Sequence, residues 1–209
     1  MKGLLLKDWY MMKAYCRSYL LIITVFLAVS FAGEDNMFFM FYPCVFCGML
    51  PINLLGYDER SRWLQYTGTL PCTKAQIVSA KYLIGLFVQL AMILVTCIVQ
   101  AVRMAVSGGF AMDEFIVFIL TLLTVAPLSS AISLPFIFKL GVEKGRIAYY
   151  VMIGLICGAS ALAANLFNGT MQIDIQPNTF VYLLAAFSIG LYVFSWFLSI
   201  WFYQKREIT

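Results

Sequence analysis

The sequence predicts an all-α integral membrane protein with six transmembrane helices, on the evidence of its composition, charge spacing and charge asymmetry. Of its 209 residues, 63% are apolar and 11% are charged, whereas soluble domains contain about 45–50% and about 25%. A spanning helix needs about 20 apolar residues, so this length holds six spans with short connections. We therefore expect residues 1–209 to form a single transmembrane domain, without a second folded domain.

The stretches without charged residues position the spans, because the bilayer core excludes charge. They predict transmembrane helices at residues 18–33, 37–56, 80–104, 114–138, 147–167 and 179–203. The first of these, 16 residues long, rises only about 24 Å, which is less than the hydrocarbon thickness. We expect it to cross nevertheless, because Lys13 and Arg17 can reach toward the headgroups and the crossing separates the basic N-terminus from Glu34.

The basic residues predict the orientation, because Lys and Arg near span ends stay in the cytoplasm. All but one of the 14 basic residues fall in four segments that share one side: Lys2, Lys7, Lys13 and Arg17; Arg60, Arg62, Lys74 and Lys81; Lys139, Lys144 and Arg146; Lys205 and Arg206. The opposite side carries Arg103 with Glu34, Asp35, Asp113, Glu114 and Asp174. We expect both termini in the cytoplasm. The net charge of +4 therefore reflects basic and acidic residues on opposite sides of the membrane, rather than a patch that binds nucleic acid.

Residues 1–17 are predicted to form an amphipathic helix in the headgroup plane. Apolar residues recur there at steps of three and four, with basic residues beside them. A cleaved signal peptide is the alternative interpretation, and the length of the charged leader disfavours it.

Several kinds of chemistry are missing from the sequence. The chain has no histidine, which excludes His-ligated metals and His-dependent nucleophiles, and it has no Gly-Lys-Ser/Thr phosphate loop. No Asp, Glu or Lys lies deep in a predicted span, which disfavours an internal proton-driven cycle. Cys44 and Cys47 are interpreted as apolar packing residues. We expect no catalytic, metal or cofactor site on this chain.

Prolines and glycines predict irregular packing within the spans. Pro127 and Pro135 are expected to kink the fourth span, with Ser129, Ser130 and Ser133 satisfying freed carbonyl groups. Pro43 and Pro51 are expected to act likewise in the second span. In the fifth span Gly154 and Gly158 give a face of small residues, which suits either packing within the chain or a dimer interface.

The connection at residues 57–79 is longer than a turn requires. Asp58 and Glu59 are typical of a helix N-terminus, and Gly68 with Pro71 ends that helix. Thr73 and Gln76 then form a capping box that starts the third span.

This short charged helix, held against the membrane and followed by a rigid spanning helix, has the geometry of a lever. Its aromatic residues Trp63 and Tyr66 suit either a protein contact or an aromatic belt on the lipid headgroups.

Two segments, MKGLLLKDWYMMK and YDERSRWLQYTGTLPCTKAQIVSAKYL, resemble the membrane subunits of ABC-2 type exporters. They are most similar to the small six-span permeases that export phenol-soluble modulins and related amphipathic peptides. The residues that carry the resemblance are Lys7, Asp8, Tyr57, Asp58, Glu59, Trp63, Tyr66, Leu70, Pro71, Gln76, Ile77, Val78, Lys81 and Tyr82.

The resemblance implies a permease in the bacterial cytoplasmic membrane that exports an amphipathic or hydrophobic substrate, with a peptide favoured. A separate ATPase subunit would carry ATP and Mg²⁺, and a second permease chain, identical or paralogous, would complete the complex. The connection would contain the coupling helix that docks on the ATPase, with these residues at the contact: Asp58, Glu59, Arg60, Arg62, Trp63 and Tyr66. A membrane scaffold or peptide sensor without transport is the main alternative, and a channel or sodium-coupled carrier is the third.

Overall fold

The computed structural model describes residues 2–15, 17–31, 37–67, 72–106, 112–147, 150–151 and 177–205. All regular secondary structure within these ranges is helical. The helices are α1 (Lys2–Tyr15), α2 (Arg17–Phe31), α3 (Met37–Gly48), α4 (Leu50–Arg60), α5 (Trp63–Thr67), α6 (Lys74–Val106), α7 (Met112–Leu140) and α9 (Pro177–Lys205). Residues 142–147 form one further short helix.

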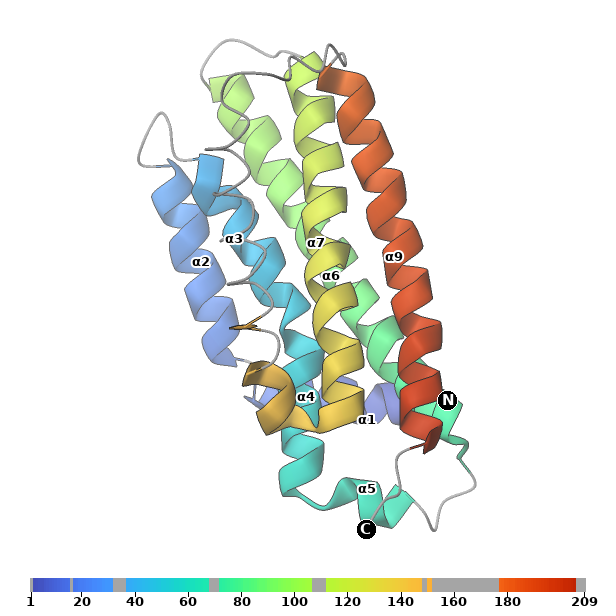
Figure 1. Ribbon diagram of the computed structural model, residues 1–209. Helices are drawn as coiled ribbons and strands as arrows, with labels where there is room; N and C mark the ends of the chain where they lie inside the picture. Colours follow the sequence, from blue (N-terminus) through green and yellow to red (C-terminus); the bar gives the residue numbers. More distant parts are fainter. Residues whose placement is uncertain are drawn as a thin grey trace.

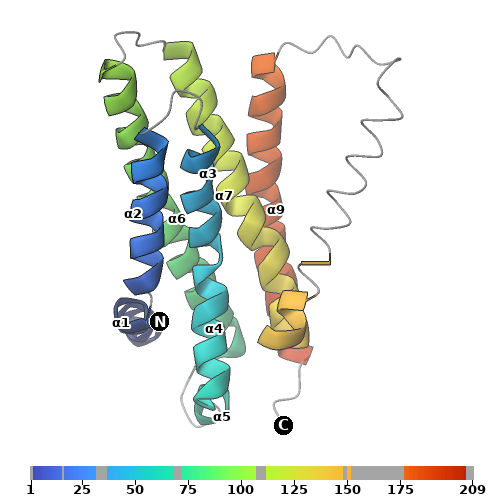
Figure 2. The ribbon, with the colours of Figure 1, turned by 90° about the vertical axis from the view of Figure 1, so that its left-hand side faces the viewer.

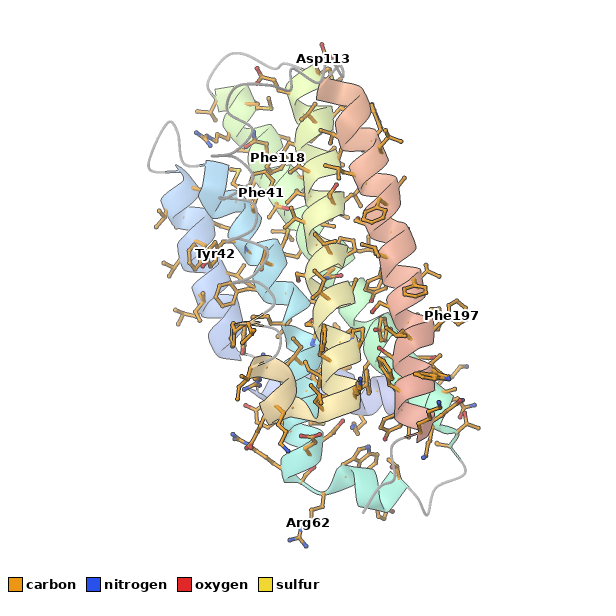
Figure 3. All side chains as sticks on the ribbon, in the orientation of Figure 1. Phe41, Tyr42, Arg62, Asp113, Phe118 and Phe197 are labelled. Atoms are coloured by element: carbon orange, nitrogen blue, oxygen red, sulfur yellow. The ribbon has the colours of Figure 1, made fainter. Side chains whose placement is uncertain are left out.

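The long helices stand side by side as a bundle, and α1 lies across one end of it (Figures 1 and 2). We call this the basal end; it also carries α5 and the last turn of α9. The opposite, apical end carries the beginnings of α7 and α9. Helices α7 and α9 therefore run in the same direction and pack along each other. Arg62 and Asp113 lie at opposite ends (Figure 3), as the predicted partition of charge requires.

Four helical segments among the described residues are long and apolar enough to cross a membrane: Met40–Arg60, Lys74–Val106, Met112–Leu140 and Val181–Lys205. The apolar part of α2, Leu21–Ser30, is shorter than a spanning helix. The predicted fifth span lies almost entirely outside the described residues, and so do Gly154 and Gly158. The count of six spans therefore stays a prediction.

The outward faces of α6 and α9 are apolar along their length. Phe87, Leu94, Phe187 and Phe197 are each more than half exposed, and Figure 3 shows Phe197 pointing away from the bundle. Apolar surface on this scale is uncommon in a soluble monomer and normal where a helix faces lipid.

The second predicted span is interrupted beside Pro51, whereas α3 runs unbroken through Pro43. Helix α3 ends at Gly48 and α4 begins at Leu50, with Pro51 in its first turn. Proline has no N–H to continue the helical ladder across Met49. The break coincides with a close approach of helices, because Gly48 lies against Ser129 and Gln89, and its missing side chain makes the contact possible.

Helix α7 runs unbroken through Pro127 and Pro135. Each proline leaves without a helical donor the carbonyl four residues earlier, which belongs to Leu123 and Ala131. The carbonyl of Leu123 accepts a hydrogen bond from Ser188 Oγ at 3.1 Å. The carbonyl of Ala131 accepts one from Ser195 Oγ at 2.7 Å. Both serines belong to α9, so two proline-freed carbonyls of α7 are satisfied by its parallel neighbour.

The serines expected to satisfy these carbonyls, Ser129, Ser130 and Ser133, do not do so, and that prediction is wrong. Ser133 Oγ donates to the carbonyls of Ser129 and Ser130 at 2.8 and 3.3 Å, neither of which a proline frees. Ser130 Oγ instead accepts from Gln89 Nε2 at 2.7 Å and donates to Gly48 O at 3.3 Å. Ser130 therefore connects α3, α6 and α7, whereas Ser133 bonds only within α7. The kink at each proline stays a prediction.

Two apolar clusters form the core. One contains Met40, Cys44, Cys47 and Leu122 and joins α2, α3, α6 and α7. Both cysteines are buried there, which agrees with their interpretation as packing residues. The other cluster lies nearer the basal end and includes residues of α1, α4, α6, α7 and α9. It packs directly beside the charged residues described next.

Candidate functional site: a buried charge cluster beside the α4–α5 turn

The connection after the second span folds differently from the prediction at its start. Helix α4 continues through Asp58 and Glu59 and ends at Arg60, so the prediction that a helix begins at Asp58 is wrong. The chain turns at Ser61 and Arg62, and Arg62 adopts a left-handed backbone conformation with φ of 53°. Helix α5 follows directly at Trp63. The two acidic residues thus belong to the last turn of the span, where their side chains point into the bundle.

The capping box at the start of α6 is confirmed. Gln76 N donates to Thr73 Oγ1 at 3.3 Å, and Thr73 N donates to Gln76 Oε1 at 3.2 Å. This reciprocal pair satisfies two donors that a helix N-terminus otherwise leaves to solvent. It fixes where α6 begins and therefore where Lys81, two turns further on, enters the bundle.

Lys7, Asp8, Asp58 and Lys81 form a closed cluster of four charges, which we call the charge cluster. Lys7 Nζ lies 2.6 Å from Asp58 Oδ1 and 3.2 Å from Asp8 Oδ1. Lys81 Nζ lies 2.6 Å from Asp58 Oδ2 and 2.7 Å from Asp8 Oδ1. Each ammonium thus bridges both carboxylates, and the cluster is electrically neutral. Its members come from α1, α4 and α6.

Burial makes this cluster energetically sensitive. The side chains of Asp8, Asp58 and Lys81 are only 2–3% exposed, and that of Lys7 is 21% exposed. Removing an ion from water costs several kcal/mol, which mutual attraction recovers only when every charge keeps its partner. Loss of one member therefore strands a buried charge, typically at a cost of about 3–5 kcal/mol. The cluster thus fixes the positions of three helices relative to one another.

Helix α5 contacts this cluster through Trp63. The Lys7 ammonium lies 4.4 Å from the centre of the Trp63 ring, in cation–π geometry. The Trp63 and Tyr66 rings pack with their centres 5.5 Å apart. Tyr66 is 58% exposed. A continuous set of contacts thus leads from the surface of α5 through Trp63 and Lys7 to α1, α4 and α6.

Glu59 makes a second connection from the same turn. Its Oε2 accepts a hydrogen bond from Val142 N at 3.0 Å, at the start of the short helix formed by residues 142–147. Gly141, with φ of 86°, supplies the left-handed residue that turns the chain out of α7. Because carboxylates favour helix N-termini, Glu59 ties the end of α4 to the segment that follows α7.

The six residues proposed for coupling therefore fall into two groups. Asp58, Glu59 and Trp63 face the bundle through the contacts above. Arg60, Arg62 and Tyr66 are exposed. Figure 3 shows that the Arg62 side chain projects outward from the bundle at its basal end. One group therefore lies on the surface of the basal end, and the other contacts α1, α6 and the short helix after α7.

Sequence reasoning missed the pairing inside the charge cluster. It placed Lys7 on the polar margin of the N-terminal helix and Lys81 among the cations of the connection, whereas each contacts two buried carboxylates. Asp8 had no assigned role beyond the resemblance. One signal was present, because Asp8 is the single acidic residue of the basic leader. No group of three or more His, Cys, Asp or Glu side chains suitable for a metal occurs within the described ranges.

Comparison with known families decides the class of protein. A family model described as ABC-2 family transporter protein matches residues 3–204. The chain belongs to this family. Members are membrane transport subunits of ABC transporters, which implies an ABC ATPase partner and a membrane setting for this chain. No curated protein and no solved structure matches the sequence. The charge cluster and α5 are thus features of an ABC-2 membrane subunit.

Proposed function

We propose that this ABC-2 subunit is the permease of an ATP-driven exporter and that the α4–α5 turn receives the movement of a separate ATPase subunit. In this proposal the exposed surface of Arg60, Arg62 and Tyr66 contacts the ATPase, which carries ATP and Mg²⁺. The single observation that carries the proposal is the contact of Trp63 with Lys7 at 4.4 Å, because it joins a short exposed helix to a cluster that holds three other helices.

The geometry supports transmission rather than simple attachment. Coupling requires an element with defined contacts at both ends, and α5 has an exposed side at Tyr66 and an inward side at Trp63. Displacement of Trp63 moves Lys7, and Lys7 bonds to Asp58 at 2.6 Å. Movement of α5 is therefore passed to α1 and α4 together, and through Lys81 to α6.

The proposed setting is a bacterial cytoplasmic membrane with the basal end in the cytoplasm. Its support is the positive-inside rule applied to the basic segments of the sequence. We further propose six spans, a working unit of two permease and two ATPase chains, and an amphipathic or hydrophobic peptide as substrate. The apolar and aromatic composition of the spans, with 18 Phe, 12 Tyr and 11 Met residues, supports an adaptable apolar passage.

The test uses the chain reconstituted with its ATPase in vesicles loaded with a fluorescent amphipathic helical peptide. ATP hydrolysis and peptide movement are measured on the same preparation. For Trp63→Ala we expect ATP hydrolysis to continue while peptide movement falls toward background. The matched control is Trp201→Ala, because Trp201 is an exposed aromatic residue near the C-terminal end of α9, a helix that does not contact α5.

Two results contradict the proposal. Equal effects of Trp63→Ala and Trp201→Ala on transport would show that Trp63 has no special role in coupling. A chain that assembles with no ATPase would remove the exporter function altogether and favour the scaffold or sensor alternative.

A further inference from the structure

A cavity of about 240 Å³ lies beside the break in the second span. Phe46, Met49, Ile52 and Ile137 give it apolar walls. Its polar groups come from separate elements: Tyr19 from α2, Asn53 from α4, and Arg146 and Tyr150 from the chain after α7. The cavity therefore combines apolar walls with several polar groups, and Arg146 is the one charged residue among those that line it.

That charge, the guanidinium of Arg146, is held in place by a neutral amide. Arg146 Nη2 donates to Asn53 Oδ1 at 2.7 Å. Asn53 Nδ2 in turn donates to the carbonyl of Met49 at 3.1 Å and contacts Tyr19 OH at 2.6 Å. The amide is thus fixed by the helix break and by α2, and it directs the arginine into the cavity.

Among the described residues, no carboxylate lies at ion-pair distance from Arg146. Glu59, further along α4, is directed to Val142 N at 3.0 Å. The stretch that follows Arg146 directly, Ile147 to Ile173, contains no Asp or Glu in its sequence. A guanidinium carries five N–H donors and matches the oxygen atoms of phosphate groups. The partly buried Arg146 therefore has the capacity to bind an anion inside the cavity.

From these observations we propose that the cavity binds the phosphate headgroup of an anionic phospholipid from the basal leaflet. Basic pockets between spanning helices are the usual sites of such recognition. The size argues for a headgroup: at about 30 Å³ per water-sized group, the cavity of about 240 Å³ admits roughly eight such groups.

The location also favours lipid. Asn53 lies two turns before the end of α4 at Arg60, which places the cavity inside the basal end of the bundle. Tyr150, which lines the cavity, is 60% exposed. Aromatic residues at this depth suit the boundary between headgroups and acyl chains. Lipid binding at this site does not depend on the proposed transport function.

The experiment measures lipid retained by the full chain in neutral detergent, by native mass spectrometry. The chain is exchanged into mixtures of phosphatidylglycerol and phosphatidylcholine with matched acyl chains. We expect one phosphatidylglycerol per chain to be retained in preference to phosphatidylcholine. Equal retention of the two lipids by the unmodified chain would overturn the proposal, and this comparison requires no variant to fold.

The variants localise the site. Arg146→Gln is expected to weaken phosphatidylglycerol retention by about fivefold or more, the contribution of one basic residue to binding anionic lipid. Arg146→Lys keeps the charge and is expected to retain part of the preference. The matched control is Lys144→Gln, which removes an exposed cation from the same short helix and is expected to leave retention unchanged. Equal losses for Arg146→Gln and Lys144→Gln would overturn the proposal.

A further experiment with peptides tests whether the bound anion is a peptide carboxylate rather than a lipid phosphate. An amphipathic peptide is added with either a free or an amidated C-terminus. Phosphatidylglycerol is expected to stay bound in both cases. If the free carboxylate displaces the lipid and the amide does not, the site belongs to a peptide terminus and the lipid assignment is wrong.

Discussion

Two buried polar regions of this protein satisfy polar groups between helices with different kinds of partner. At the basal end, Lys7, Asp8, Asp58 and Lys81 pair as full charges, with distances of 2.6–3.2 Å. Along the interface of α7 and α9, the serines Ser188 and Ser195 donate to carbonyls that prolines leave free. Both regions satisfy buried polar groups between helices, but one uses ions and the other only neutral groups.

The difference follows from depth in the bundle. A full charge in the hydrocarbon core costs several kcal/mol, and the charge cluster lies at the basal end, where Lys7 retains 21% exposure. Within the core, a neutral hydrogen bond between helices contributes about 0.6–2 kcal/mol. Strong, specific pairing is thus concentrated where α5 makes contact, and weaker bonds are distributed along the spans.

The largest effect is expected from breaking the charge cluster. Asp58→Asn leaves two lysines facing one remaining carboxylate, so we expect a loss of about 3–5 kcal/mol in stability. Thermal denaturation in detergent, followed by circular dichroism, measures the change. Arg60→Gln, at an exposed position in the same turn, is expected to shift stability by no more than about 0.5 kcal/mol. Equal shifts would contradict the claim that loss of one member leaves a buried charge without its partner.

An intermediate effect is expected at the close approach of α3 and α7. A β-carbon at Gly48 would overlap Ser129 Oγ and lie 3.1 Å from Gln89 Nε2, so Gly48→Ala should cost about 1–3 kcal/mol through overpacking. In the control Gly190→Ala, the added β-carbon meets nothing within 4 Å. That substitution should be neutral or slightly stabilising, because Ala favours helix more than Gly does. Unfolding of the two variants is compared in one detergent.

The smallest effect is expected at the serine-capped carbonyls. Ser188→Ala removes the donor to Leu123 O, at a cost of about 0.6–2 kcal/mol. In a Pro127→Ala background, residue 127 regains the N–H that bonds Leu123 O, so the same serine substitution should cost less. A double-mutant cycle on unfolding free energies measures this coupling. An additive result would show that Ser188 does not compensate for the proline.

Local features of the sequence were predictable, and distant pairings were not. The capping box of Thr73 and Gln76 was readable because both partners lie within one turn. Asp58 was assigned to a helix N-terminus, since Asp favours that position. Its actual partners, Lys7 and Lys81, lie on other helices, and this tertiary pairing overrides the local preference.

The prolines of α7 show the same limit. The sequence indicated that Pro127 and Pro135 free two carbonyls, but the nearest hydroxyls in the chain were the wrong donors. The donors Ser188 and Ser195 come from α9, more than 60 residues away in sequence. Only the packing of α9 along α7 brings them into reach. The Arg146 cavity likewise depends on the break at Met49, which positions Asn53.

The most direct test of the contrast is a double-mutant cycle on Asp58 and Lys81, whose charged atoms lie 2.6 Å apart. The variants are Asp58→Asn, Lys81→Met and the double substitution, and the quantity measured is the free energy of unfolding in detergent. Because each single change strands a buried charge and the double change removes both, we expect a coupling energy of about 2–3 kcal/mol. This exceeds the coupling expected between Ser188 and Pro127. Additivity within about 0.5 kcal/mol would contradict the account.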